Sequence, residues 1–189
     1  MELLLGIFSA FGLSASAGLN AYIPLMVIAV IARYTDWFNL QAPFDTLTNP
    51  WVMILLGVLI ILELLADSIP AVNHINDAIQ TFIRPAAGAI AFASSAQVLT
   101  DVSPVISLAC GLLIAGGVHT VKAAAVRPAV TATTGGAANP LVSIAENIIA
   151  TLTSILSLLI PVLMAILLVV ALLLIVRWFI HRSSRAQAI

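Results

Sequence analysis

Long runs of apolar residues are the feature that most constrains this chain. The clearest runs cover residues 50–66, 105–118 and 153–180, and each contains few charged side chains. In water such runs would be insoluble surface, whereas a helix crosses a bilayer with about 20 apolar residues. Inside lipid, a helix also satisfies its own backbone hydrogen bonds. We therefore expect an all-α, polytopic membrane helix bundle.

The composition agrees with this class. Hydrophobic residues make up 62% of the chain and charged residues 8%, against about 45–50% and about 25% in soluble domains. The 189 residues leave room for about six spans in a single transmembrane domain covering 1–189. The net charge of −1 and the lack of a long basic tract give no sign of a nucleic-acid partner. The expected partner is the lipid bilayer, and a homo-oligomer stays open.

Two segments interrupt the apolar pattern with glycine, proline and amide residues. The first is SASAGLNAYIP, with Gly18, Asn20 and Pro24, and the second is TATTGGAANP, which covers residues 131–140. Glycine loosens a helix and proline removes a backbone donor, so we expect two discontinuous or re-entrant helices.

Proline residues set the other expected boundaries. Pro50 and Pro70 suit first helical turns, and the helix that begins at Pro70 should end or kink at Arg84-Pro85. The next segment, 85–100, can cross as a thin helix or re-enter the membrane. The apolar stretch after Leu141 is too long for one span, so we expect it to bend near 151–153 or at Pro161.

The two interrupted segments resemble each other. SASAGLNAYIPLMVIA (14–29) and TATTGGAANPLVSIA (131–145) match at several small, glycine and proline positions. If each opens a three-helix unit, the halves 1–100 and 101–182 have opposite orientations, which is typical of inverted-repeat transporters. The alternative is a chance likeness between alanine-rich segments.

Charged residues gather within this apolar sequence, although an ionised side chain at bilayer depth costs several kcal/mol unless it is paired or faces a cavity. They are Glu63, Asp67, His74, Asp77, Arg84, His119, Lys122, Arg127 and Glu146. One interpretation is an ion-pair cluster that fixes helix register. The other is a polar pathway for a solute. A metal site from His74, Asp77, Glu63 and His119 is weaker, because the ligands lack HxxxH or ExxH spacing. We expect no metal and no cofactor.

The placement of Lys and Arg predicts the orientation. With six crossings, Arg84, Lys122, Arg127 and the basic tail fall on one side and Arg33 on the other. Cytoplasmic ends carry the excess of basic residues. We therefore expect both termini, including the tail 183–189, to be cytoplasmic.

Three strings are distinctive: LSASAGLNAYIPL, LADSIPAVNHINDAIQTFIRPAAGA and HTVKAAAVRPAVTATTGGAANPLVS. They resemble segments of a bacterial integral-membrane family catalogued as "domain of unknown function 4126", over residues 10–150. The resemblance implies a compact multi-helix protein of the inner membrane. It implies no established activity and supplies no catalytic residues.

The patterns together predict a small transporter or channel of unknown solute, leaning toward an anion or proton coupling. A backbone-rich binding zone is expected at Gly18, Asn20, Thr133, Gly135, Gly136 and Asn139. The charged residues named above would line the pathway. No HExxH, GxSxG, Walker or dinucleotide pattern is present, so an enzyme is not expected. The alternatives are a non-transporting scaffold with structural ion pairs and an intramembrane lipid-modifying enzyme.

Overall fold

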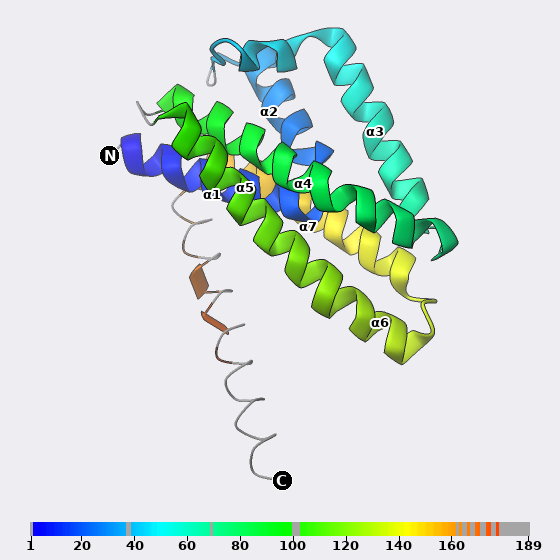
Figure 1. The fold of residues 1–189 in the computed structure, drawn as a ribbon. Coiled ribbons are helices and arrows are strands. Elements are labelled where there is room, and N and C mark those ends of the chain that lie inside the picture. Colours follow the sequence, from blue (N-terminus) through cyan, green and yellow to red (C-terminus); the bar gives the residue numbers. More distant parts are fainter. Residues whose placement is uncertain are drawn as a thin grey trace.

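The computed structural model describes residues 2–36, 39–68, 70–99 and 103–161, together with scattered positions between 163 and 177. At 2–4, 68, 70–74 and 97–99 only the backbone is described. Helices account for nearly all of the described chain, which contains no strand, so the all-α prediction is confirmed. In order these are α1 (Glu2–Leu19), α2 (Tyr22–Tyr34), a 3₁₀ turn (Phe44–Thr48), α3 (Pro50–Ser68), α4 (Pro70–Leu99), α5 (Pro104–Val121), a π-helical turn (Lys122–Val126), α6 (Arg127–Thr134) and α7 (Asn139–Leu159) (Figure 1).

The bundle turns its apolar side chains outward and keeps small and polar ones inside. On α7 the residues at 143, 146, 150, 154 and 157 are all buried, and four of them are polar. Leu141, Ile148 and Leu152 on the same helix are exposed. In water this arrangement would be inverted, whereas helices in lipid commonly pack through small and polar residues.

Three helical segments are long and apolar enough to cross a membrane, by length and composition: Pro50–Asp67, Pro104–Thr134 and Asn139–Leu159. Leu5–Leu19 and Tyr22–Tyr34 are shorter apolar helices. This pattern indicates a membrane protein. The expected total of about six crossings stays a prediction.

The predicted first break is present, and Asn20 stabilises it. Helix α1 ends at Leu19, and α2 leaves its end in a different direction (Figure 1). The Asn20 Oδ1 atom accepts hydrogen bonds from the backbone N–H groups of Tyr22 and Ile23, both at 3.0 Å. An asparagine side chain can satisfy otherwise unpaired donors at a helix start in this way. The polar residue therefore fixes where the second helix begins.

The prediction for Arg84-Pro85 is wrong on one point. An end of the helix at this point is wrong, because α4 continues through Pro85 as a single helix of 30 residues. A kink at Pro85 stays a prediction. Proline is tolerated inside membrane helices when neighbouring groups compensate for the lost backbone hydrogen bond. Segment 85–100 is therefore largely the second half of α4 rather than a separate re-entrant helix.

The second break lies where the sequence predicts it, at the glycine pair. Helix α6 ends at Thr134, and Gly135 and Gly136 follow with φ angles of 63° and 89°. Residues other than glycine rarely adopt such backbone angles. Helix α7 then starts at Asn139 and ends at Leu159, just before Pro161, which confirms the alternative of a break at that proline.

A π-helical turn places two cations on the same side of one helix. Segments α5, Lys122–Val126 and α6 form a continuous helix from Pro104 to Thr134, and the Arg127 N–H donates to the Lys122 carbonyl five residues earlier. In a regular α-helix at about 100° per residue, positions 122 and 127 would lie about 140° apart. The wider turn brings both side chains into the interior. Pro128 follows directly, and π turns commonly accompany such local disturbance.

Helix α1 lies at the centre and packs against α4, α5 and α7. Its buried serines donate to backbone carbonyls of the neighbours: Ser9 to Ser157, Ser14 to Gly111 and Ser16 to Ala150, at 2.7–2.8 Å. Such hydrogen bonds between membrane helices contribute about 0.6 kcal/mol each on average. The α1 serines therefore act as packing groups.

The internal repeat receives no support from the two matched glycines. A Cβ at Gly18 would lie 2.6 Å from the Ala115 carbonyl oxygen, so this glycine allows close packing of α1 on α5. Gly135 lies in an exposed turn, where a Cβ would meet nothing within 4 Å. The two positions have different structural roles.

The contact between α4 and α5 depends on glycine and gives a first prediction. A Cβ at Gly111 would collide with the Gly88 carbonyl and lie 2.7 Å from Ala89 Cα. Because these are backbone atoms, the helices must separate, and Gly111→Ala should lower stability by about 1–3 kcal/mol. Thermal unfolding of the detergent-solubilised protein, followed by tryptophan fluorescence, measures the change.

Gly117→Ala is the matched control on the same helix. A Cβ there would meet nothing within 4 Å, so the substitution should be neutral or stabilise the helix by up to about 1 kcal/mol. Equal destabilisation by both substitutions would contradict the close approach of α4 and α5.

Candidate functional site

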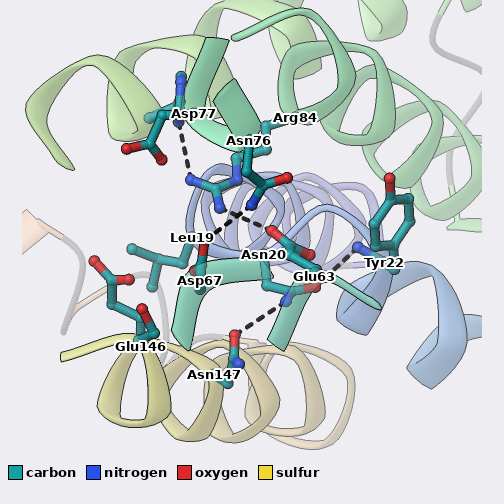
Figure 2. A network of polar contacts seen from close by, with 12 residues as sticks. Leu19, Asn20, Tyr22, Glu63, Asp67, Asn76, Asp77, Arg84, Glu146 and Asn147 are labelled. Carbon is teal, nitrogen blue, oxygen red and sulfur yellow. Dashed lines mark hydrogen bonds and ion pairs between the residues drawn. The ribbon is translucent and has the colours of Figure 1, made fainter. Parts of the chain in front are cut away.

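Six charged side chains meet in the interior between α3, α4, the α5–α6 helix and α7, and we call them the charge network. Figure 2 labels four of them, Glu63, Asp67, Arg84 and Glu146. Each of the six residues is at most 7% exposed. Three are acids and three are bases, so their formal charges cancel: Glu63, Asp67 and Glu146 against Arg84, Lys122 and Arg127. The network thus brings together residues from four separate helical segments of the chain.

Arg84 forms the first part of the network and is fully buried. Its Nη2 donates to Glu63 Oε1 at 2.8 Å, and its Nη1 lies 3.0 Å from His119 Nδ1. A guanidinium has no acceptor, so His119 Nδ1 accepts and carries no proton. The His119 Nε2 atom lies 3.2 Å from Thr81 Oγ1. Arg84 therefore fixes the neutral imidazole in its Nε2-protonated form.

Arg127 forms the second part and joins α3, α6 and α7. Its Nη2 lies 3.0 Å from Asp67 Oδ2, 3.0 Å from Ser143 Oγ and 3.3 Å from Glu146 Oε2. Asn76 donates to the other Asp67 oxygen at 2.9 Å. Lys122 Nζ lies 2.7 Å from the same Glu146 oxygen. Glu146 thus links the two cations that the π turn presents.

The network also contacts the break between α1 and α2. Lys122 donates to the Leu19 carbonyl at 3.0 Å, at the C-terminal end of α1, where a cation is favourable. Asn20, the next residue, donates to Asn147 Oδ1 on α7 at 3.0 Å (Figure 2). The first helix break is therefore held on both sides by polar contacts.

Several buried polar atoms in and around the network have no hydrogen-bond partner among the described residues. Within the network these are Glu63 Oε2, Arg84 Nε, and Arg127 Nε and Nη1. Asp77 Oδ1, Gln80 Oε1 and Asn139 Oδ1 share this property nearby. A buried donor or acceptor without a partner costs about 1–3 kcal/mol, and more for a charged group. These atoms mark where water or a ligand would bind.

The family whose description reads "Domain of unknown function (DUF4126)" matches residues 7–181. The chain belongs to this DUF4126 family. The resemblance seen in the sequence is thereby confirmed. No curated protein and no solved structure matches the chain.

In the structure of this DUF4126 protein, no hydrogen bond among the described residues joins the two halves of the predicted backbone-rich binding zone, residues 18–20 and 133–139. Asn20 bonds Asn147 rather than Asn139, whose Nδ2 donates to Thr131 Oγ1 at 3.3 Å. Thr133 and Gly135 are exposed, Gly136 is buried, and Gly18 packs on α5. The two interrupted segments therefore contact different parts of the bundle.

Most of the predicted charged residues do come together, with two exceptions. Asp77 is half-buried and lies outside the ion pairs formed by the described residues. The side chain of His74 lies outside the described residues. The described part of the chain contains no group of three His, Cys, Asp or Glu residues that could hold a metal ion.

The sequence analysis missed several uncharged partners: Asn76, Thr81, Ser143 and Asn147. Ser143 had a detectable signal, since it belongs to the buried series at three- and four-residue spacing on α7 that includes Glu146 and Ser154. Asn147 lies just outside that series and had no such signal. Its role depends on the direction in which α2 leaves α1.

The burial of Arg84, Lys122 and Arg127 removes part of the argument for orientation. The charge rule concerns basic residues in loops and near the ends of spans, whereas these three are paired with acids inside the bundle. The predicted orientation then depends on Arg33 and the basic residues from Arg177 onward.

A groove of about 530 Å³ lies between α2, α3 and α7 and is separate from the charge network. Eight of its lining residues are apolar, including Ile23, Ile60 and Ile148, and two are polar, Asn147 and Thr151. None of the six network residues lines it. Asn147 is thus shared between the groove and the contact with Asn20.

The pair formed by Glu63 and Arg84 gives a second prediction. Arg84→Met leaves Glu63 buried without its cation, and breaking a buried pair in this way costs about 3–5 kcal/mol. The double variant Glu63→Leu/Arg84→Met removes both charges and should recover part of the loss. Thermal unfolding in detergent measures both variants.

Arg33→Met serves as the control, because Arg33 is exposed and the change should cost about 1 kcal/mol or less. A double variant that is no more stable than Arg84→Met would show that the two residues do not interact as the structure describes.

Proposed function

We propose that this protein is an integral membrane transporter or channel, and that the charge network is its solute- or ion-binding centre. The observation that carries the proposal is the set of buried network atoms without partners: Glu63 Oε2, Arg84 Nε, and Arg127 Nε and Nη1. The apolar exterior and the three span-length helices support a location of this centre inside a membrane protein.

The argument depends on what a purely structural cluster would require. Ion pairs that only fix helix register are most stable when each donor and acceptor is satisfied, since a half-satisfied polar network is worse than an apolar core. In the charge network, one acceptor on Glu63 and three donors on Arg84 and Arg127 have no partner among the described residues. Water or a solute can satisfy both kinds, so the open atoms favour a hydrated or solute-binding centre.

A scaffold is the second candidate, and a different observation favours it. Every acid and base of the network has an opposite charge within 3.3 Å. Interlocked pairs of this kind can hold helices in register without moving any solute. In this case the protein would support a partner complex. The lipid-modifying enzyme is favoured by neither observation, because the residues that line the groove include no histidine and no carboxylate.

Glu63→Gln separates transport from scaffolding and is the third prediction. An amide at this position keeps the oxygen that accepts from Arg84 and places its NH₂ where Oε2 has no partner. The shape and the Arg84 contact are preserved while the charge is lost. We expect the variant to lose some stability, because Arg84 keeps its hydrogen bond but not its opposite charge. The folded protein in reconstituted vesicles should show flux reduced at least tenfold, screened with protons, monovalent cations and anions.

Asp67→Asn is a less clean test of the same idea. Both Asp67 oxygens accept from donors, Arg127 and Asn76, so an amide NH₂ must face one of them. Loss of flux in Asp67→Asn alone would therefore be compatible with local distortion. If the wild-type protein moves none of the tested solutes, or if Glu63→Gln moves as much as wild type, the transport proposal fails and the scaffold takes its place.

The proposed location is the bacterial inner membrane, with several crossings and both termini cytoplasmic. The basic residues near the C-terminus support this orientation. As a fourth prediction, a cysteine at position 187 on a Cys110→Ala background should resist impermeant thiol reagents in intact cells and react after lysis. Labelling in intact cells would reverse the orientation.

A further inference from the structure

The hydrogen-bond partners of Arg127 are distributed unevenly over its three nitrogens. It is 5% exposed, and three oxygens surround its Nη2 while Nε and Nη1 have no partner among the described residues. The Nη2 carries only two hydrogens for those three oxygens. The cation is therefore crowded at one nitrogen and open at the other two.

We propose that Arg127, through Nε or Nη1, which have no partner among the described residues, binds a small oxyanion of the carboxylate or phosphate type. The inference rests on the proposed binding centre and names its solute class. A guanidinium offers donors only and stays charged, so the missing partners of Nε and Nη1 must be acceptors. Charge-assisted hydrogen bonds from Arg to carboxylate or phosphate are among the strongest in proteins.

The acids already present at Arg127 do not meet this need. Asp67 and Glu146 both approach Nη2, and Glu146 is shared with Lys122. Neither acid is a hydrogen-bond partner of Nε or Nη1. The site is built from four segments: α6 carries Arg127, and α3, the π turn and α7 contribute Asp67, Lys122 and Glu146.

The balance of charges in the network determines how tightly we expect the oxyanion to bind. The six network charges cancel, so an added anion binds to a formally neutral centre and gains little from long-range attraction. Binding then depends on hydrogen bonds from Arg127, and a dissociation constant on the order of millimolar is expected. Such weak binding suits a solute that must also be released.

Arg127→Lys is the decisive variant. A lysine keeps the positive charge for Asp67 and Glu146, and its three N–H groups match the three oxygens now around Nη2. No donor is left for an anion. Isothermal titration calorimetry of the purified protein with sodium acetate and sodium phosphate should show wild-type binding and a loss of about 10- to 100-fold in Arg127→Lys, the equivalent of about one charged hydrogen bond.

Matched controls make the result specific. Arg33→Lys is the same change at an exposed position and should leave binding unaltered. Sodium chloride replaces the sodium salts to correct for ionic strength. If Arg127→Lys does not fold, the pair Asp67→Asn/Arg127→Gln, which removes one charge of each sign, takes its place and should also lose binding.

The source of the oxyanion is tested in nanodiscs of neutral lipid with and without phosphatidic acid. Competition between phosphatidic acid and free phosphate would assign the site to a lipid headgroup, and unaltered phosphate binding would assign it to a dissolved solute. Absence of acetate, phosphate and phosphatidic acid binding in the wild type, or equal binding in Arg127→Lys, overturns the inference. Flux of protons or cations in that case would leave the transport proposal standing, whereas anion binding without any flux would leave only the site.

Discussion

Burial of ionised side chains away from water is the constraint on which the rest of this structure depends. Arg84 is fully buried, and an unpaired charge in such a place costs several kcal/mol. Glu63 from α3 and His119 from α5 must therefore reach it, which holds three helices together. The same demand at Arg127 joins α3 to α7. The polar interior, rather than an apolar core, selects which helices meet.

Close packing of the helix backbones allows these charged side chains to reach one another. Gly88 and Gly111 let α4 and α5 approach until a single added Cβ would collide. Arg84 lies one turn before Gly88 on α4, and His119 lies two turns after Gly111 on α5. The short distance between the helices at the glycines continues to the charged residues, where long side chains meet at about hydrogen-bond distance. The small-residue contact and the charge network are thus two parts of one interface.

The sequence predicted the membrane class, both helix breaks and most members of the network, because each has a local signal in apolar runs, glycine, proline or charge. It could not predict the pairing, since choosing Arg84 for Glu63 and Arg127 for Asp67 requires the helix packing. The prediction that α4 ends at Pro85 was wrong, because neighbouring helices can compensate a missing hydrogen bond in ways that a proline alone does not reveal. The π turn at Lys122–Val126 also had no recognised signal, although Pro128 follows it.

The network and the groove meet at two consecutive residues of α7. Glu146 points into the network and binds Lys122, while Asn147 lines the groove and accepts from Asn20. Lys122 in turn holds the Leu19 carbonyl, directly before Asn20. A closed circuit therefore runs from Glu146 through Lys122, Leu19, Asn20 and Asn147 back to α7. Under the proposed function, an anion that displaces Glu146 from Lys122 changes the surroundings of the same cation that donates to the Leu19 carbonyl at the end of α1. The break between α1 and α2 is then the element of the described fold that is best placed to respond to occupancy of the network, because one of its two polar supports is Asn147 and the other, Lys122, is paired with the neighbouring residue Glu146.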